Sequence, residues 1–575
     1  MPEGDARKFR GLGFFTWLRR QLGPDSRLWH STMAISSALL LLAAFPPFSI
    51  DYCAWVALGP LLHVITRGIR LRRAFWLGWL CGVVFTFFAE NWIAHSMTHF
   101  GGLLTVVAYA VAFLFASLLA VFPALFALTM AQLVRTLGPV GLAGAPIVWV
   151  ATEWLRPVVT GVTWNALGIS QVRNFPIARL SQYGGAYLIS WELVGASTLL
   201  LLFLRGRQKI NRQTAAAVIL MMLVPLLLPA GGRVPNGDGP SERALQRVTP
   251  VRILGVQPHI PLGSDGGPEE FTRKFAGVRS LTLDGMRRNA ERKPDLVIWA
   301  ESPLALFYEN DPSVRERVDA LAKETGAFIV ANTITREADQ YFNSVHVISP
   351  RVGDGKPDIP LKRYDKIRLV PFGEYVPWRA VLGRFVPAIV GDFAPGRDAV
   401  VNTVRLETIR EGLAVNGPQQ EPQLQIERNT RFVRIGAFIC YEAAYPDLVR
   451  QFVNNGATLL VNVSNDAWFG DTAGPEQHLA HAMMRAIEND RDLVRVTNSG
   501  ITALITSDGV VVDALPRSTA AFQAWEAMAR GGVRTFYTRH GDLFAIGCTW
   551  AATLLAAICV TRWLLARRAA RSLEV

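Results

Sequence analysis

Acidic residues are almost absent from a long stretch near the start of this chain. Between Met33 and Ala230 there are four, against 46 Asp and Glu in the 575 residues as a whole; they are Asp51, Glu90, Glu153 and Glu192. Half of all residues are hydrophobic and 18% are charged, whereas about a quarter are charged in an ordinary soluble domain. The stretch predicts a membrane domain, and so apolar a chain excludes a small secreted module and a disordered protein.

Eight apolar segments are candidates for membrane-spanning helices, which need about 20 mostly apolar residues with some tolerance. One of them, Leu543 to Val560, follows a long polar region. The other seven are Thr32 to Phe45, Tyr52 to Thr66, Ala74 to Ala89, Leu103 to Leu133, Gly138 to Leu155, Gly185 to Leu204 and Thr214 to Leu228. We expect an N-terminal segment over 1–32, a membrane domain over 33–230, a soluble domain over 231–542, a C-terminal transmembrane helix over 543–561 and a tail over 562–575.

Basic residues predict the orientation of these segments. The net charge is +13, and many of the Lys and Arg residues flank apolar runs. We therefore expect the chain to bind a membrane and not a nucleic acid. Groups of these basic residues precede the first segment and follow the second, sixth and eighth, and Arg135 follows the fourth; the positive-inside rule assigns all of these ends to the cytoplasm. The loop from Arg156 to Tyr183 on the opposite side still carries three. Seven spans that start from a cytoplasmic N-terminus place 231–542 outside the cytoplasm. The eighth span then returns the C-terminal tail to the cytoplasm.

The polar region alternates short β-branched runs with amphipathic ones, which is typical of a layered α/β fold. Expected strands are Val251 to Val256, Leu296 to Trp299, Phe328 to Ala331, Val345 to Ser349, Val433 to Ile439, Thr458 to Val463 and Leu493 to Val496. Expected helices are Pro268 to Glu291, Ser313 to Glu324, Pro446 to Val453 and Pro475 to Asp490. Asn416 to Gln425 reads as an inserted surface loop, and Ser507-Asp508-Gly509 as a hairpin turn.

One cysteine stands apart from the other four. Cys53, Cys81, Cys548 and Cys559 fall in predicted spans, whereas Cys440 ends a predicted strand of the soluble region. A lone free cysteine is often only a small buried hydrophobe. Glu301, however, also follows a strand, and Lys366 and Glu374 lie in the segment RYDKIRLVPFGEYVP. A thiol, a carboxylate and an ammonium are the groups that thiol acyl transfer needs, as nucleophile, general base and oxyanion stabiliser.

The motifs around these residues resemble the nitrilase superfamily, and most closely its membrane branch, the apolipoprotein N-acyltransferases. They are VQPHI at Val256, DLVIWAES at Asp295, RYDKIRLVPFGEYVP at Arg363, GAFICYEAAYP at Gly436, NVSNDAWFG at Asn462 and RVTNSGIT at Arg495. The resemblance covers nearly the whole chain. It implies a multi-span α-helical membrane domain joined to a nitrilase-like four-layer αββα sandwich.

The resemblance also implies roles for single residues. Glu301 would be the general base, Lys366 the oxyanion stabiliser and Cys440 the nucleophile, with no metal and no organic cofactor. Glu374, Tyr441, Glu442 and Trp164 would support the site or bind substrate. The implied reaction is ping-pong, from a phospholipid acyl donor through a cysteine thioester to the α-amine of a diacylglyceryl apolipoprotein. It implies a monomer in the inner membrane, with the catalytic domain in the periplasm.

Several alternatives stay open. A membrane-tethered amidase would use the same triad, but eight spans are needless for a small soluble substrate. A transporter fits poorly with a large external domain, and an inactive paralogue fits poorly with an intact triad. His478 and His481 lack a third metal ligand in the sequence, which favours a structural role. Glu90, Glu153 and Glu192 either anchor the chain at the membrane interface or contact a lipid headgroup or the acceptor.

Overall fold

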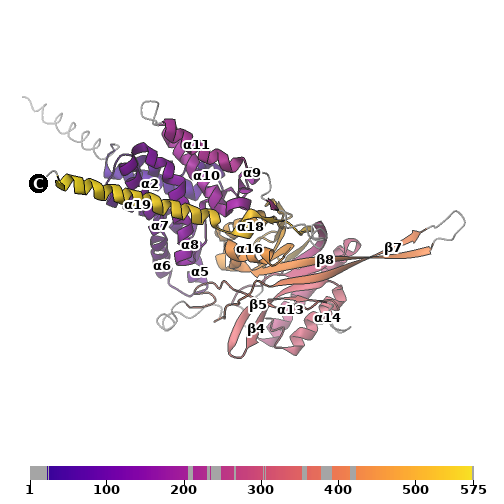
Figure 1. Cartoon of the computed structure of the whole chain (residues 1–575). Coiled ribbons are helices and arrows are strands. Elements are labelled where there is room, and N and C mark those ends of the chain that lie inside the picture. Colours follow the sequence, from indigo (N-terminus) through magenta and orange to yellow (C-terminus); the bar gives the residue numbers. More distant parts are fainter. Residues whose placement is uncertain are drawn as a thin grey trace, which may run out of the picture. The chain divides into compact units, whose positions relative to one another are not determined.

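The structure, a computed structural model of the whole chain, forms two compact units (Figure 1). It describes residues 23, 25–204, 212–228, 233–234, 248–263, 267–301, 304, 306–351, 359–376, 392–414 and 423–572. The helical unit comprises residues 1–230, 471–477 and 542–575, and the α/β unit comprises 231–470 and 478–541. Each unit is described separately below.

The helical unit consists of α-helices joined by short 3₁₀ turns. Its α-helices are α2 (Arg27–Ala44), α3 (Gly59–Ile65), α4 (Leu71–Ala89), α5 (Trp92–His99), α6 (Thr105–Leu119), α7 (Val121–Leu137), α8 (Ala145–Thr160), α9 (Phe175–Ala178), α10 (Ser181–Leu204), α11 (Arg212–Leu226) and α19 (Leu543–Ser572). The 3₁₀ turns are η1 (Asp51–Trp55), η2 (Gly138–Gly144) and η3 (Leu167–Gln171).

Four helical segments among the described residues are long and apolar enough to cross a membrane. They are Leu71–Ala89, Thr105–Thr160, Ser181–Leu204 and Leu543–Ala566. The second of them combines the expected fourth and fifth spans. The unit is therefore membrane-spanning in character, and the full count of eight spans stays a prediction.

Small residues allow the helices of this unit to approach closely. A Cβ on Gly82 of α4 would lie 2.9 Å from the Cα of Ala120, the residue between α6 and α7. Such small-residue contacts are typical of helix packing in membranes. The expected fourth span is thus two helices meeting at Ala120. Helix α10 is likewise interrupted, since Gly184 and Gly185 have non-helical backbone angles.

The α/β unit contains two six-stranded sheets. The first has the order β13-β2-β3-β4-β5-β6 and the second the order β12-β11-β10-β9-β8-β7. The strands of the first are β13 (Ala521–Arg530), β2 (Val248–Gln257), β3 (Leu296–Trp299), β4 (Phe328–Glu337), β5 (Gln340–Ile348) and β6 (Tyr364–Asp365). Those of the second are β12 (Val511–Val512), β11 (Ala503–Ile505), β10 (Leu493–Thr497), β9 (Leu459–Ser464), β8 (Gln423–Ile439) and β7 (Val401–Ala414). Strands β1 (Arg233–Val234) and β14 (Arg534–Thr535) form a separate antiparallel pair.

Helices cover the outer faces of the two sheets, which gives the expected layered fold. Helices α13 (Pro268–Arg288) and α14 (Pro312–Thr325) pack on β2, β3 and β4 in one hydrophobic core. Helix α16 (Pro446–Asn454) packs on β8. Further described helices are α17 (Gly474–Asn489), α18 (Phe536–His540) and the short η4 (Ala290–Arg292) and η6 (Asp466–Phe469). The sheets face each other, since a Cβ on Gly255 of β2 would lie 3.3 Å from Val496 of β10.

The expected strands and helices of this unit all form, and two details differ. Strand β8 begins at Gln423, so the last three residues of the expected loop Asn416 to Gln425 are strand. Residues 416–422 lie outside the described residues. Strand β8 pairs with β7 from Gln423 to Gly436 but with β9 only from Ile435 onward, so the two strands extend as an arm beyond the sheet (Figure 1). The expected turn at Ser507-Asp508-Gly509 joins β11 to β12.

Candidate active site

Cys440 lies directly after strand β8, as the first residue of the 3₁₀ helix η5 (Cys440–Ala444). Its φ is +52°, a left-handed conformation that costs about 1–2 kcal/mol for a residue with a side chain. The residue is also 7% exposed. A buried thiol at a strand end, held in a strained turn, is typical of a functional site.

Two side chains hold this turn by the main-chain carbonyl oxygen of Cys440. Nε2 of His478 lies 3.0 Å from that oxygen, and Nδ2 of Asn462 donates to it at 3.3 Å. Burial, followed by the Arg495 charge, lowers the pKa of His478. The charge of Asp466, whose Oδ1 lies 3.0 Å from Nδ1 of the same ring, opposes this shift. The contact with the Cys440 carbonyl requires a proton on Nε2, because a carbonyl oxygen can only accept.

An ionic layer lies behind these two side chains. Arg495 donates from Nη2 to both carboxylate oxygens of Asp466, at 2.8 and 2.7 Å, and from Nη1 to Asn462. Its Nη2 also lies 3.0 Å from Nδ1 of His478. Asp466, Arg495 and His478 are all at most 2% exposed. The expected structural role of His478 thus takes a specific form, which is to position the main chain of Cys440.

Glu301, Lys366 and Glu374 form one buried ionic cluster. Lys366 Nζ donates to Glu374 Oε1 at 2.9 Å and lies 3.7 Å from Glu301 Oε1. Asn343 on β5 donates from Nδ2 to the same two oxygens, at 2.9 and 3.0 Å. The second carboxylate oxygen of Glu301 is buried and has no hydrogen-bond partner among the described residues. That oxygen remains available to accept a proton.

The electrostatics tie the cluster to the thiol. Burial and the negative charge of Glu301 raise the pKa of Cys440 to about 12, although Lys366 opposes them. Burial raises the pKa of Glu301, Lys366 lowers it and Glu374 raises it, with a net rise. Burial lowers the pKa of Lys366, but the charges of Glu374 and Glu301 outweigh burial and raise it. At neutral pH the cluster therefore combines a neutral thiol, a lysine cation and a carboxylate of increased basicity.

Glu442 holds the segment around Lys366 against the turn of Cys440. Its Oε1 accepts hydrogen bonds from the Tyr364 hydroxyl at 2.7 Å and from the backbone N–H groups of Ile367 and Arg368 at 2.7 and 3.0 Å. Its Oε2 accepts from the N–H of Ile439 at 2.8 Å. Glu442 is fully buried. It thus binds the main chain on both sides of the site.

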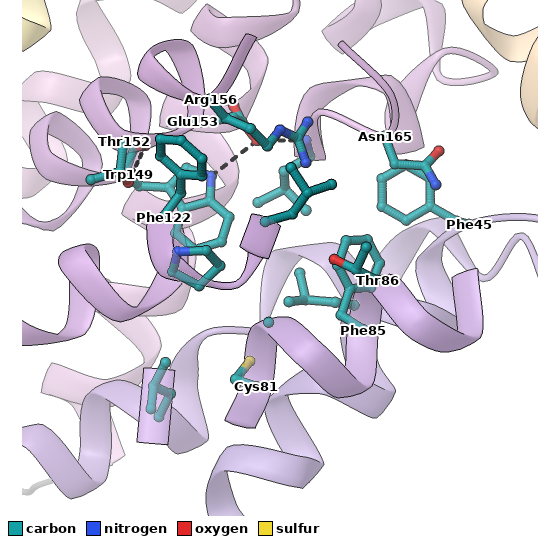
Figure 2. Close-up of a pocket in the computed structure, with 16 residues that line it drawn as sticks. Phe45, Cys81, Phe85, Thr86, Phe122, Trp149, Thr152, Glu153, Arg156 and Asn165 are labelled. Carbon is teal, nitrogen blue, oxygen red and sulfur yellow. Dashed lines mark hydrogen bonds between the residues drawn. The ribbon is translucent and has the colours of Figure 1, made fainter. Parts of the chain in front are cut away.

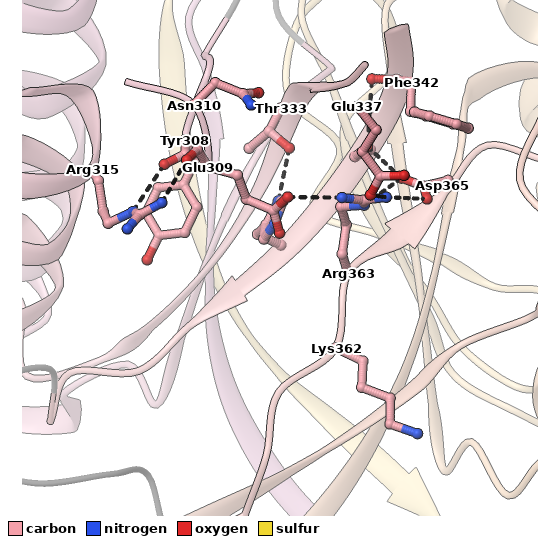
Figure 3. A network of polar contacts seen from close by, with 12 residues as sticks. Tyr308, Glu309, Asn310, Arg315, Thr333, Glu337, Phe342, Lys362, Arg363 and Asp365 are labelled. Atoms are coloured by element: carbon pink, nitrogen blue, oxygen red, sulfur yellow. Dashed lines mark hydrogen bonds and ion pairs between the residues drawn. The ribbon is translucent and has the colours of Figure 1, made fainter. Parts of the chain in front are cut away.

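A network of charged side chains near the surface also holds the segment that precedes Lys366. Arg363 contacts Glu309 at 2.7 Å, Glu337 at 2.7 Å and Asp365 at 2.8 Å (Figure 3). Glu309 also contacts His346 of β5 at 2.9 Å. Strand β6, which directly precedes Lys366, is therefore fixed to β4 and β5 by charged groups on three separate chain segments.

Two further predicted site residues, Tyr441 and Trp164, make contacts within their own units. Tyr441 is half-buried, with its ring 5.4 Å from that of Tyr445 in an edge-to-face contact. Trp164 belongs to the helical unit and is 1% exposed. Its Nε1 donates to Gln477 Oε1 at 2.8 Å, and its carbonyl accepts from Arg156 at 2.6 Å, both within that unit.

Three glutamates of the helical unit are buried in protein. Glu90, Glu153 and Glu192 are 3%, 8% and 1% exposed. Glu153 accepts hydrogen bonds from Leu167 N at 2.7 Å and from Trp149 Nε1 at 3.2 Å. It lies with Arg156 on the wall of a mostly apolar pocket (Figure 2). Burial of this kind fits a role inside the unit better than anchoring at a lipid–water interface.

Sequence reasoning missed three residues with specific contacts in this site. Asn343 stands inside a strand, where asparagine is uncommon, and that was the available signal. Asp466 and Arg495 were quoted within motifs but received no role. Their pairing was not predictable, because 28 residues separate them and only the parallel pairing of β9 with β10 brings their segments together.

Comparison with known proteins agrees with both units. The family model "Apolipoprotein N-acyltransferase N-terminal domain" matches residues 37–199, and the model "Carbon-nitrogen hydrolase" matches residues 271–523. The solved structure of Nit3 from Saccharomyces cerevisiae, a member of branch 10 of the nitrilase superfamily, matches 48% of this chain and 90% of its own, at 15% identity and a TM-score of 0.33.

Curated relatives extend the match to nearly the whole chain. The apolipoprotein N-acyltransferase of Geobacter metallireducens is 32% identical over 552 residues, covering 92% of this chain and 95% of the relative. That of Azotobacter vinelandii is 30% identical, covering 96% and 97%, and that of Pasteurella multocida 29%, covering 84% and 87%. This chain therefore belongs to the apolipoprotein N-acyltransferase family.

Proposed function

We propose that this chain transfers an acyl group from a phospholipid to the α-amine of the S-diacylglyceryl cysteine at the N-terminus of apolipoproteins, through a thioester on Cys440. One observation carries the proposal. In a chain of this family, the ammonium of Lys366 and the carboxylate of Glu301 lie 3.7 Å apart with side chains 1% and 13% exposed, and the charges of both shift the pKa of the Cys440 thiol. This reaction completes lipoprotein maturation.

In the first half-reaction, the thiol of Cys440 attacks the ester carbonyl of the phospholipid. Glu301 accepts the thiol proton, and Lys366 stabilises the negative charge on the carbonyl oxygen. The S–C bond forms, the ester C–O bond breaks, and Glu301 returns the proton to the departing alkoxide. A lysophospholipid leaves. Glu374 and Asn343 serve as positioning residues, since both hold the groups that act.

In the second half-reaction, the α-amine of the apolipoprotein attacks the thioester carbonyl. Glu301 accepts a proton from the amine, the N–C bond forms and the C–S bond breaks. The proton returns to the thiolate of Cys440, which restores the enzyme. No metal or organic cofactor is needed, because an ester and a thioester are already activated for acyl transfer.

The surroundings of the site support transfer to an amine over hydrolysis. Lys366 is 1% exposed, Glu374 5% and Cys440 7%, so little water reaches the reacting groups. A thioester that is shielded from water survives until the second substrate arrives. The buried cluster thus suits a two-substrate reaction.

The location follows from the family and from the apolar helices. We propose that the α/β unit works on the periplasmic face of the inner membrane, because the basic residues of the sequence flank the opposite ends of the predicted spans. Both substrates are lipids, so a membrane-anchored enzyme meets them in the bilayer. All groups of the cluster come from one chain, and a monomer suffices.

Intact mass spectrometry tests this proposal directly. The detergent-purified protein is incubated with phospholipid, then treated with hydroxylamine or with a diacylated lipopeptide. We expect one acyl adduct on Cys440 that hydroxylamine removes and that the peptide amine discharges as N-acyl peptide. The Cys440→Ala variant is expected to form no adduct.

The amidase alternative gives a different result in the same experiment. A folded protein that forms no adduct with phospholipid, but releases ammonia from small amides, would replace the acyltransfer proposal. An adduct that is discharged to water at the same rate with and without lipopeptide would identify a hydrolase.

A further inference from the structure

A cavity of about 210 Å³ lies in the α/β unit, away from Cys440. Space of this size holds several water molecules, since one needs roughly 10–15 Å³ by the same measure. Its charged lining is Arg434, Arg491 and Arg534, without a carboxylate. Asparagine, threonine and glycine supply most of the remaining wall, namely Asn454, Asn455, Gly456, Thr458, Gly531 and Gly532.

The cavity lies at the opposite end of the strands from the catalytic cluster. Arg434 stands just before β8 begins its parallel pairing with β9 at Ile435. Thr458 precedes β9, and Arg491 precedes β10. Cys440 lies six residues beyond Arg434 along β8, which is roughly 20 Å in an extended strand. The cavity is therefore separate from the catalytic cluster.

Positive charge is concentrated here without matching negative charge. Burial and then Arg534 lower the pKa of Arg434. Burial lowers the pKa of Arg491 to about 10, helped by Arg434, Arg530 and Arg534 and opposed by Asp490. In the described part of the chain Asp492 is also nearby, and it is engaged by Ser507 N, Met528 N and Arg530. These four arginines thus outnumber the two described acids near them.

The lining arginines differ in how far protein groups satisfy them. Arg491 donates to four backbone carbonyls and is part of the framework. Among the described residues, Arg534 has only long contacts, at 3.4 and 3.5 Å, with Asn454. The guanidinium of Arg434 has no hydrogen-bond or ion-pair partner in the described part of the chain.

The backbone leaves room for the Arg434 guanidinium. Gly456 has a φ of +100°, and a Cβ there would lie 2.9 Å from Nη1 of Arg434. A glycine is therefore required both by the backbone angle and by the space that the guanidinium occupies.

We propose that this cavity is a binding site for a phosphate group, held by the guanidinium groups of Arg434 and Arg534 over the fixed Arg491. Paired guanidinium groups match the geometry of phosphate oxygens. A bound dianion or phosphodiester would offset the repulsion among the arginines. The site goes beyond the proposed acyl transfer, since it shares no residue with the catalytic cluster.

A free phosphate and a phospholipid headgroup are both sources of this group. Arg534 lies on β14, and seven residues separate the end of β14 at Thr535 from α19, the C-terminal apolar helix. Strand β14 pairs with β1, which follows α11 in the sequence. Both sources share the same chemistry, and the experiment distinguishes them.

Binding is measured on the full-length, detergent-purified protein in the Cys440→Ala background, which prevents turnover. The probes are inorganic phosphate and, separately, dihexanoyl phosphatidylglycerol below its micelle concentration, each against sodium chloride at equal ionic strength. Isothermal titration gives the affinity, and tryptophan fluorescence gives the Tm. We expect saturable binding and a rise in Tm with at least one probe.

The test variant is Arg434→Gln combined with Arg534→Gln. We expect binding to weaken at least tenfold. We also expect the Tm in chloride to stay level or rise, because repulsion is relieved. The matched control is Arg273→Gln combined with Arg317→Gln, which removes two exposed arginines from α13 and α14 and is expected to bind like the parent. If the double variant does not fold, Arg534→Gln alone is used as the test variant, because it removes only the long contacts of Arg534 with Asn454 among the described residues.

The outcomes separate the sources and can overturn the proposal. If both probes bind the parent and the double variant loses affinity equally for both, the phosphate group alone is sufficient for binding. Binding of phosphatidylglycerol only identifies a lipid headgroup site. Absence of binding by either probe, or equal affinity in the variant and the parent, overturns the site. A failure of acyl transfer to Cys440 would not affect these measurements, which do not depend on catalysis.

Discussion

His478 Nε2 and the main-chain carbonyl oxygen of Cys440 lie 3.0 Å apart, and this contact holds the nucleophile by its backbone. The thiol is left unconstrained by that contact, while the turn that presents it is fixed. Asn462 donates to the same oxygen. A strained turn needs such restraints, because the left-handed conformation is unfavourable for cysteine.

His478→Leu is therefore expected to slow acyl-enzyme formation by about tenfold, which corresponds to the roughly 1.4 kcal/mol of one hydrogen bond. The measurement is the rate of adduct formation at saturating phospholipid, where a positioning role lowers kcat more than it raises KM. The matched control is His540→Leu, which changes a partly exposed histidine of α18. An unchanged kcat would remove the positioning role.

Cys440→Ala is expected to abolish transfer, with a loss of at least about 10³-fold, because no other group can form the thioester. Folding and membrane insertion are expected to persist. Radiolabelled acyl transfer to lipopeptide measures the activity. Cys548→Ala, which removes a buried thiol of α19, is the matched control and is expected to stay active.

Glu301→Gln is expected to lower acyl-enzyme formation by about 10²–10⁴-fold, the usual contribution of a general base. Its Tm is expected to hold or rise. The folded pKa of Glu301 is raised, so its contribution to stability is present only at low pH and is lost as pH rises through that pKa. Thermal unfolding at pH 7 measures this effect, with the exposed Glu291→Gln as control. A clearly lower Tm would contradict the assignment of burial as the dominant influence.

Lys366→Met is expected to destabilise the protein by about 3–5 kcal/mol, because it leaves Glu301 and Glu374 buried without a cation. A lower denaturation midpoint and a lower Tm measure this loss. Lys362→Met, four residues earlier and exposed (Figure 3), is the control and is expected to be neutral. Equal stability of the two variants would mean that the carboxylates do not depend on the ammonium.

The pH dependence of acyl-enzyme formation follows from the raised pKa values of Glu301 and Cys440. Glu301 acts in its ionised form and has a raised pKa, so the rate is expected to fall on the acid side at a pH above the ordinary value for glutamate. The pKa of Cys440 is about 12, so the rate is expected to be flat from pH 7 to 9. A tenfold rise per pH unit across that range would instead indicate attack by free thiolate.

Much of the α/β unit was predictable, because several of its strands are short apolar runs bounded by polar, glycine or proline residues. Leu296 to Trp299 matches β3 residue for residue, and Pro268 begins α13 as expected. Strand β13 was missed, since its alternation of alanine with Phe522, Trp525 and Met528 carries little β-branched character. Only its antiparallel pairing with β2 makes it a strand.

The site was predictable in its reacting groups and not in its supports. Cys440, Glu301 and Lys366 follow strands or lie in a distinctive motif, which a sequence displays. Glu442 supports the site by accepting hydrogen bonds from main-chain N–H groups near Lys366, more than 70 residues away in the sequence. Hydrogen bonds to the main chain leave no pattern in the sequence, so this role emerged only from the fold.

The positive φ of Cys440 also bears on how members of this fold would change over time. A copy released from selection for catalysis keeps the strained turn but no longer needs its thiol. Glycine adopts the same backbone angle without strain, so replacement of Cys440 by glycine would be favoured by stability alone. Drift at this position thus has a preferred direction, and a glycine here would mark a descendant that has abandoned chemistry while retaining the fold.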